Sequence, residues 1–534
     1  MKEAFTKVIE LLYLAKQDEV EIILNDGRLQ LKVPDNKDID QKLLDQIRAN
    51  KESLIDFLSK EDLKLRTVDS NQKIIKAERN SQSFKIPLSF SQERLWFIDQ
   101  LEGSLQYHIT AVLRLKGIMN KNAVEHALNE IVNRHEILRT VYIEEDGEPW
   151  QRVKPENEWK LTTTSGTGYL EDKTGLYSYI QNTTRSPFNL AKDYMLRSEL
   201  ITLAEEEHLL VVTMHHIASD AWSTPIFVKE LGELYTAYAD GRSPNLNSLP
   251  IQYSDYAIWQ RSYLQEELLN RKLDYWKKKL DDVAPLQLPL DYKRPAVSSN
   301  RGASALFMIS PELRDQLRIL SQRNAATLYM TLLSAFKVLL YRYSGQEDVC
   351  VGTSIAGRPQ AELEGLIGFF VNTLALRSNV SGKISFNNLL QQVRQTMLEA
   401  YGNQEVPFER VVEAVVKDRD ISRNPLFQVM LVLRNTPDVP ELRLGNLLLS
   451  GEPYEHTTVK FELTFFMTES PRGIQGSVLY STDLFKRDRI DRMMEHFTSL
   501  LESIVASPDQ SVGSLSILRE TEDKLLKEQF SCAS

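Results

Sequence analysis

Cysteine is nearly absent from this chain of 534 residues, which contains only Cys350 and Cys532. Two cysteines can form neither a disulfide framework nor a zinc site built on cysteine ligands. Long apolar runs are missing too. No stretch is long enough to cross a bilayer, and residues 1–5 mix charged and apolar side chains, unlike a signal peptide. We therefore expect a protein of the cytoplasm that has no membrane partner.

Charge of one sign is not concentrated in any segment. The net charge of -10 is mild for this length, and the basic residues are scattered instead of forming the stripe that a phosphate backbone selects. Hydrophobic residues make up 42% and charged residues 26%, as in soluble globular proteins. The chain is too long for one ordinary domain. We expect several domains and no nucleic-acid partner.

Residues 1–60 have the pattern of a miniature α+β domain. Two β-rich runs, residues 20–24 and 29–33, flank Asn25, Asp26 and Gly27, which is a strong hairpin signal because Asn and Gly tolerate positive φ. Apolar residues recur at helical spacing before and after these runs. Residues 61–83 are charged and polar and have the composition of a linker.

The large remainder alternates helical stripes with β-rich runs and has no short repeat. An interruption rich in proline and serine at about residues 283–304 divides it into segments 84–284 and 285–518. We expect an α/β (α+β) fold of two lobes joined by a crossover, with a cleft between them. Residues 519–534 look like the start of a helix and are expected to be a linker toward a further domain.

One stretch, MHHIASDAWS at residues 214–223, carries candidate chemistry. An apolar strand leads into His215 and His216, and Asp220 follows four residues after the second histidine. Neighbouring residues at a strand end point in opposite directions, so one imidazole can face a cleft while the other packs inside. A neutral imidazole suits general-base catalysis near neutral pH. Asp220 could fix the turn or orient the ring.

The pattern alone leaves other interpretations open. A pair of histidines at a strand end is more often structural than catalytic. A zinc site formed by His215, His216 and Asp220 is also conceivable, but the chain has only eight histidines and no second cluster to complete a ligand shell. We expect no metal.

The stretch HHIASDA resembles the signature of the condensation domains of nonribosomal peptide synthetases, which is two histidines, three variable residues, Asp and Gly. Further stretches resemble other motifs of this family and follow its order: LSFSQERLWF (88–97), RHEILRT (134–140), YSDYAIWQ (253–260), IGFFVNTL (367–374), PFE (407–409) and NPLFQV (424–429). The resemblance extends over about residues 86–518, and the ordered set is far more specific than the histidine pair alone.

The resemblance implies two chloramphenicol-acetyltransferase-like lobes in a V shape, with a tunnel whose centre holds His216. A donor acyl thioester would enter from one face and an acceptor aminoacyl thioester from the other, both on phosphopantetheine arms of carrier proteins, so the chain itself needs no cofactor. The acceptor amine would attack the donor carbonyl. His216 could deprotonate the amine, stabilise the tetrahedral intermediate or orient the nucleophile.

Other residues near the motif are expected to support the site. We expect His215 and Asp220 to stabilise the loop, with Asp220 paired to Arg134 or Arg139. Those two arginines could equally lie at the solvent-exposed end of a helix. Trp222 and Asn372 belong to the matching motifs.

Ala221 stands where the family usually has glycine. If this position needs positive φ, alanine would strain the turn by about 1–2 kcal/mol. Otherwise its methyl group narrows the tunnel. We expect an active enzyme that accepts a restricted range of donors. The motifs around residues 220–223 and 368–372 resemble those of condensation domains that accept a donor with a D-configured terminus.

Residues 1–60 resemble the β-hairpin docking domains that precede some condensation domains. Such a domain would capture the C-terminal segment of an upstream subunit by strand addition. Arg28 and Lys32 lie on one face of the second strand and could meet an acidic partner tail, or could simply be solubilising. The resemblance also implies a downstream adenylation domain. Two alternatives remain: a catalytically silent recruitment platform, and an acyltransferase of the same fold that forms esters or uses coenzyme A.

Overall fold

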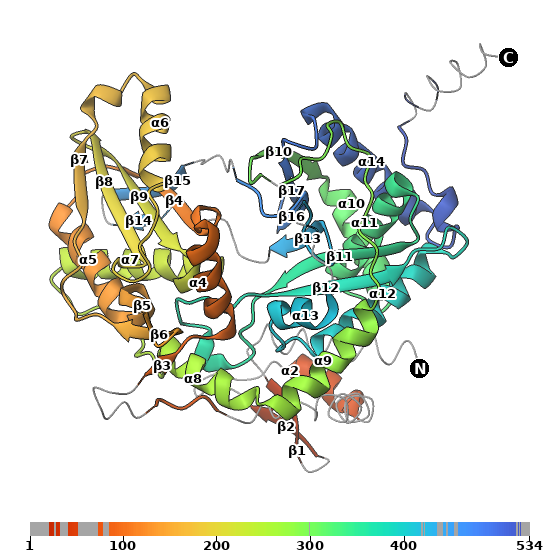
Figure 1. Cartoon of the computed structure of the whole chain (residues 1–534), viewed down its shortest axis with the longest axis horizontal. Coiled ribbons are helices and arrows are strands. Elements are labelled where there is room, and N and C mark those ends of the chain that lie inside the picture. The colour runs from red at the N-terminus through yellow and green to blue at the C-terminus, as the bar shows by residue number, and fades with distance from the viewer. Residues whose placement is uncertain are drawn as a thin grey trace.

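The computed structural model describes residues 21–25, 28–32, 41–51, 73–77, 85–297, 299–417, 420, 422–434, 442–444, 447–452, 458–519, 522 and 524. Within these residues, two lobes of mixed helix and strand stand side by side and diverge toward one end of the molecule (Figure 1). Each lobe is built on a six-stranded sheet. The predicted α/β class with two lobes is confirmed.

The N-terminal lobe centres on strand β9, whose sequence is apolar on both faces. Its sheet has the order β14 (Leu442–Leu444), β15 (Leu447–Glu452), β4 (His108–Lys116), β9 (Glu207–His215), β8 (Leu196–Ala204), β7 (Thr162–Ser165). Leu210, Val212 and Met214 pack into the main core of this lobe, and Leu209 and Val211 pack into a second core on the other face. Continuous apolar runs of this kind are typical of strands covered on both sides.

Helices cover both faces of this sheet. The main core includes buried residues of α5 (Lys121–Arg134) and α7 (Ser223–Ala239), and the second core includes those of α6 (Lys173–Thr184). Helix α4 (Phe90–Glu102) runs along the side of the lobe that faces the other lobe, and α8 (Tyr253–Tyr263) and the small sheet β3 (Ile86–Pro87), β6 (Glu148–Val153), β5 (Thr140–Glu145) lie at its base. Helix α9 (Glu266–Leu280) crosses to the C-terminal lobe, whose core includes its Leu273, Trp276 and Leu280. The first half of the chain contributes the 3-10 turns Leu105–Tyr107, Glu136–Arg139, Thr167–Tyr169 and His216–Ala218 to this lobe.

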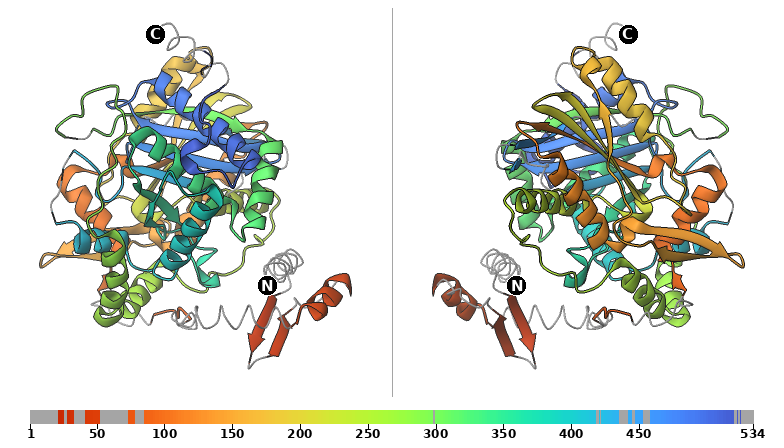
Figure 2. Two further views of the ribbon diagram at one scale, coloured as in Figure 1. Left: turned by 90° about the vertical axis from the view of Figure 1, so that its right-hand side faces the viewer. Right: turned by 90° about the vertical axis from the view of Figure 1, so that its left-hand side faces the viewer.

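The C-terminal lobe repeats the plan with its own core. Its sheet has the order β10 (Gly302–Ile309), β17 (Gly473–Ser481), β16 (Leu463–Ser470), β13 (Val429–Arg434), β11 (Asp348–Ile355), β12 (Asn372–Asn379). Its helices are α10 (Pro311–Arg323), α11 (Leu328–Ser344), α12 (Phe386–Tyr401), α13 (Phe408–Val415) and α14 (Arg487–Ala506). Helices α10, α11, α12 and α14 lie on the outer side of this sheet (Figure 2), and α11 supplies many of the fully buried residues.

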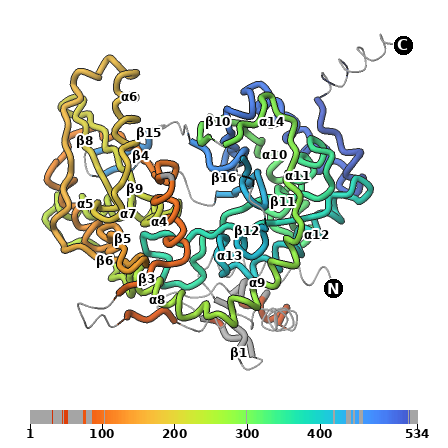
Figure 3. The backbone as a smooth tube through the Cα atoms, in the orientation of Figure 1, coloured from red at the N-terminus to blue at the C-terminus, as the bar shows by residue number. Residues whose placement is uncertain are grey.

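Two segments of the second half of the chain belong to the N-terminal lobe. Strand β15 pairs antiparallel with β4, with Leu449 opposite Leu115 (Figure 3), and β14 pairs with β15. The segment between β11 and β12 places Leu363, Leu366 and Ile367 in the core of the N-terminal lobe. The expected boundary between residues 284 and 285 therefore does not separate the two sheets. Strands β14 and β15, from the second half of the chain, complete the sheet of the N-terminal lobe.

The predicted hairpin is present as β1 (Glu21–Asn25) and β2 (Arg28–Lys32), which pair antiparallel from Glu21 opposite Lys32 to Asn25 opposite Arg28. Helix α2 (Gln41–Ala49) follows. The turn residues 26–27, the other parts of the predicted 1–60 domain, most of the predicted linker 61–83 and residues 525–534 lie outside the described residues, as do the side chains of Arg28 and Lys32. Across the described part of the chain, no helix combines the length and apolar character that a membrane span requires.

Candidate active site

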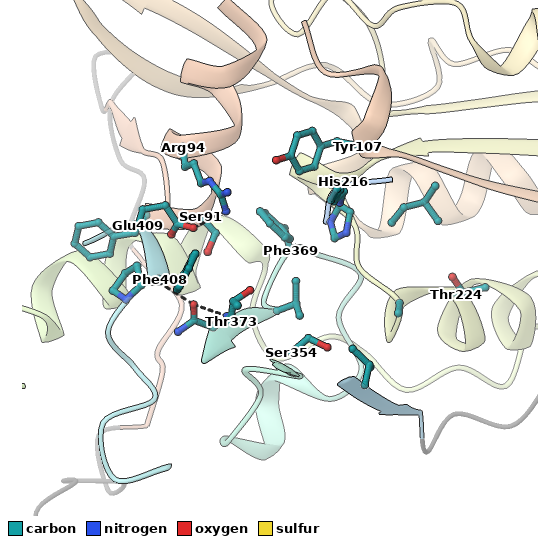
Figure 4. A pocket seen from close by; sticks show the side chains of 18 of the residues that line it. Ser91, Arg94, Tyr107, His216, Thr224, Ser354, Phe369, Thr373, Phe408 and Glu409 are labelled. Atoms are coloured by element: carbon teal, nitrogen blue, oxygen red, sulfur yellow. Dashed lines mark hydrogen bonds and ion pairs between the residues drawn. The ribbon is translucent and has the colours of Figure 1, made fainter. Parts of the chain in front are cut away.

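A cavity of about 3080 Å³ lies between the two lobes. Its walls come from α4, the turn before β4 and the start of α7 on one side, and from β12, β13, β16 and α13 on the other. His216 lies in this wall, and Figure 4 shows its ring beside Phe369 and close to Tyr107. The structure therefore brings the second histidine to a space that both halves of the chain enclose.

His216 follows the last residue of β9 and begins the 3-10 turn His216–Ala218. Its half-buried ring meets Phe369 edge-to-face at 4.8 Å between centroids and Tyr107 at 6.3 Å. The Nδ1 atom is buried without a hydrogen-bond partner. Burial, assisted by the positive charge of Lys460, holds the pKa of His216 well below its usual value. The imidazole is therefore neutral at physiological pH and can accept a proton.

His215 points the opposite way and is fully buried. Its Nδ1 accepts the backbone N–H of Ile217 at 3.1 Å, so the proton of the neutral ring lies on Nε2, which donates to Ser104 Oγ at 2.9 Å. Ser104 in turn donates to Asp99. Burial lowers the pKa of His215 to about 3. This ring is a structural link between β9 and the end of α4.

Asp220 accepts several hydrogen bonds that hold the turn after His216 in place. Its Oδ1 accepts the backbone N–H of Ser223 at 3.0 Å, and its Oδ2 accepts that of Phe370 at 3.1 Å. Arg358 Nη2 lies 3.0 and 3.2 Å from the two oxygens, and both side chains are almost completely buried. Asp220 therefore joins the histidine turn to the segment between β11 and β12.

Arg358 holds that segment in a tight loop. Its Nη1 donates to the carbonyls of Leu363 and Leu366, both at 2.6 Å, and its guanidinium lies 4.1 Å from the ring centre of Phe370. The preceding Gly357 has φ +66°, and a Cβ there would lie 1.9 Å from the carbonyl oxygen of Phe370. Only glycine fits this position.

Comparison with known proteins identifies the family. The family model described as "Condensation domain" matches residues 82–527. The chain belongs to the condensation-domain family. One of the subunits that make up the linear gramicidin synthase of Brevibacillus parabrevis is 41% identical over 452 residues, 84% of this chain and 9% of that protein. Malpinin synthetase of Mortierella alpina is 39% identical over 450 residues, 84% of this chain and 6% of that protein. The chain thus spans a small part of the length of these relatives.

Solved structures confirm the fold of this condensation domain. The X-domain from teicoplanin biosynthesis aligns with a TM-score of 0.76 and 28% identity, over 84% of this chain and 100% of that chain. The first condensation domain of the calcium-dependent antibiotic synthetase, solved in complex with a substrate analogue, aligns with a TM-score of 0.67 and 19% identity over 82% and 100% of the two chains. The two chloramphenicol-acetyltransferase-like lobes are as the motifs implied.

The predicted pairing of Asp220 with Arg134 or Arg139 is wrong. Arg134 Nε donates to Glu230 Oε1 at 3.0 Å, and Arg139 Nη2 donates to Glu156 Oε1 at 3.2 Å. Both arginines lie near the end of α5, whereas Asp220 is buried against the other half of the chain. Arg134 lines the cavity of the condensation domain, and Arg139 does not belong to its lining.

The motif residues beside Asp220 have distinct positions. Ala221 is not among the residues with positive φ, so the strain that would arise there is absent, and its side chain lines the cavity. Trp222 Nε1 donates to the carbonyl of Glu364 at 3.1 Å across the two halves. Asn372 begins β12, and its Nδ2 donates to the carbonyls of residues 404 and 406, both at 2.8 Å.

Motif analysis missed two charged residues of the site and one ion pair. Arg358 pairs with Asp220, and Lys460 lies in the cavity wall. The ion pair joins Arg94 Nη1 to Glu409 Oε1 at 2.6 Å across the lobes. Arg94 and Glu409 belong to matching motifs, but no spacing indicates that they meet. A local signal for Arg358 is available in Gly-Arg-Pro at 357–359, which is typical of a tight turn. Among the described residues, no group of His, Cys, Asp or Glu side chains is arranged to hold a metal ion.

Proposed function

We propose that this condensation domain forms an amide bond between a carrier-bound acyl or peptidyl donor and a carrier-bound aminoacyl acceptor in nonribosomal peptide synthesis, with His216 as the catalytic residue. The observation that carries the proposal is the position of this neutral imidazole in the wall of an interlobe cavity. The phosphopantetheine arms belong to the two carrier proteins. A downstream adenylation domain is the proposed neighbour beyond residue 519.

The chemistry needs little more than alignment and a proton acceptor. A thioester is already activated, and the correct placement of two bound partners can lower a barrier by about 7–11 kcal/mol. The amine nitrogen forms a bond to the donor carbonyl carbon, the carbon–sulfur bond breaks, and the amine proton passes by way of His216 to the leaving thiolate. General-base assistance of this kind contributes about 10²–10⁴-fold.

A transfer assay with loaded carriers tests the function. Donor and acceptor carriers are mixed with the protein, and the mass of the intact acceptor is followed. We expect the acceptor to gain the donor acyl group, faster with a D-configured donor terminus than with the L form. An acceptor that carries a hydroxyl in place of the amine should react poorly. Faster transfer to the hydroxyl, or to free coenzyme A thioesters, would contradict amide formation between carriers.

We further propose that residues 1–60 dock the C-terminal segment of an upstream subunit, with Arg28 and Lys32 facing an acidic tail. The antiparallel pair β1 and β2 supports this proposal, because it offers an edge for strand addition. Deleting residues 1–60 is expected to slow transfer from a separate donor subunit that keeps its tail by about tenfold or more, since tethering raises effective concentration. Transfer from the same carrier without its tail should not change. Equal slowing with both donors would contradict docking.

A recruitment platform is the second candidate, because the similar X-domain from teicoplanin biosynthesis has been solved in complex with OxyB. In that case carriers or other partners would bind, and no loaded pair would react. The transfer assay therefore separates the two functions.

A further inference from the structure

Lys460 is one of the cationic side chains that line the cavity containing His216, and it lies near the imidazole. It precedes β16, and the chain on both sides of it is anchored: Val459 N donates to the carbonyl of Asn300 at 2.8 Å, and Asn424 Nδ2 donates to the carbonyl of Lys460 at 3.0 Å. Two residues further on, Glu462 accepts both Nη atoms of an arginine at 2.8 and 3.1 Å. The backbone of Lys460 is therefore fixed relative to the sheet.

The ammonium of Lys460 rests on an aromatic ring of the other lobe. Its Nζ lies 4.1 Å from the centre of the Tyr107 ring, a distance typical of a cation–π contact. Tyr107 ends the 3-10 turn before β4, and its ring stands edge-on to His216. Tyr107 is thus in contact with both side chains, and all three line the same cavity.

We infer that Lys460 is a positioning residue for His216: resting on Tyr107, it presents a positive charge to the imidazole and, together with burial, opposes protonation of the ring that meets the acceptor amine. The inference rests on the proposed amide-forming function. A protonated His216 could not accept the proton that the amine nitrogen loses as it bonds to the thioester carbonyl carbon. Lys460 belongs to the C-terminal lobe and His216 to the N-terminal lobe. The influence of Lys460 on the protonation of His216 therefore depends on the relative position of the two lobes.

The surrounding charges define the pH range of this effect. Arg94 of α4 faces Lys460, with Glu409 of α13 as its ion-pair partner, and His215 lies behind His216. The walls of the cavity and the charge of Arg94 lower the pKa of Lys460 to about 7, although its side chain is solvent-exposed. The ammonium is therefore charged below pH 7, which is the range in which an imidazole normally takes up a proton. The effect on His216 is present below that pH and fades above it.

A titration of His216 by NMR tests the inference without any substrate. The full chain is labelled at the histidine Cε1 carbons, and the His216 signal is assigned by its absence in His216→Gln. In Lys460→Met we expect the titration midpoint of His216 to rise by about 0.5–1.5 pH units, because a like charge has been removed. Lys460→Arg should keep the wild-type midpoint.

A matched control is Arg434→Met. Arg434 also lines the cavity and rests on an aromatic ring, Phe466 at 4.0 Å, but it is not among the charges that shift the pKa of His216. Its replacement should leave the midpoint unchanged. In the transfer assay, Lys460→Met should lose more activity at pH 6 than at pH 8.

The outcomes separate this inference from the proposed function. An unchanged His216 midpoint in Lys460→Met, or equal loss of transfer at both pH values, overturns the positioning role. A wild-type protein that transfers no acyl group overturns the proposed function, and the titration still reports whether Lys460 acts on the imidazole.

Discussion

Replacing His216 by alanine is expected to slow amide formation by about 10²–10⁴-fold, which is the range of general-base assistance. The fold should be preserved, because the ring is half-buried in a cavity wall and its Nδ1 makes no hydrogen bond. Binding of loaded carriers should also be preserved. The substitution should therefore lower the rate of amide formation within the bound complex. Single-turnover transfer followed by intact mass measures it.

Two other histidines serve as controls for this substitution. His126 lies on the exposed side of α5 against Tyr238, so His126→Ala should transfer at the wild-type rate. His215→Ala removes a buried link to Ser104 and should lower stability as well as activity. A His216→Ala protein that is folded and transfers at nearly the wild-type rate would show that the imidazole plays no part in the reaction.

Replacing Arg358 by methionine is expected to lower the free energy of unfolding by about 3–5 kcal/mol. The ion pair with Asp220 is almost completely buried, so removal of the cation leaves a carboxylate without its charge partner in the interior. Adding Asp220→Asn to this variant should recover part of the loss, because the second charge is removed too and the amide oxygen can still accept a backbone N–H. Urea-induced unfolding of the single and double variants measures both effects.

The matched control is Arg377→Met, which breaks a partly exposed pair with Asp348. Exposed pairs contribute about 1 kcal/mol or less. If Arg358→Met costs no more than Arg377→Met, the buried pair does not hold the histidine turn in place.

Strand periodicity predicted the arrangement of the histidines well. Because side chains alternate along a strand, His215 and His216 had to face opposite sides, and the structure places one inside and one in the cavity wall. The hairpin was also predictable, since the turn residues between its strands are local signals. Both features are encoded within a few residues of sequence.

Long-range partners could not be predicted in the same way. Asp220 and Arg358 are 138 residues apart, and nothing in their local sequences indicates that they meet. Arg134 and Arg139 were reasonable candidates because they belong to a nearby motif, yet each has its own carboxylate. Lys460 lies outside the matching motifs. Its inferred role depends on its contact with Tyr107 of the other lobe, and only the folded structure shows this contact.

The strand β15 has a consequence for how the protein is made on the ribosome. Glu452 of β15 accepts a hydrogen bond from Arg114 of β4 across 338 residues of sequence, so this edge of β4 stays unpaired in the nascent chain until β15 has been translated. At common rates of synthesis this wait lasts roughly 20–70 s. An unpaired edge strand invites pairing with other chains. During this interval the growing polypeptide carries an edge strand that favours aggregation.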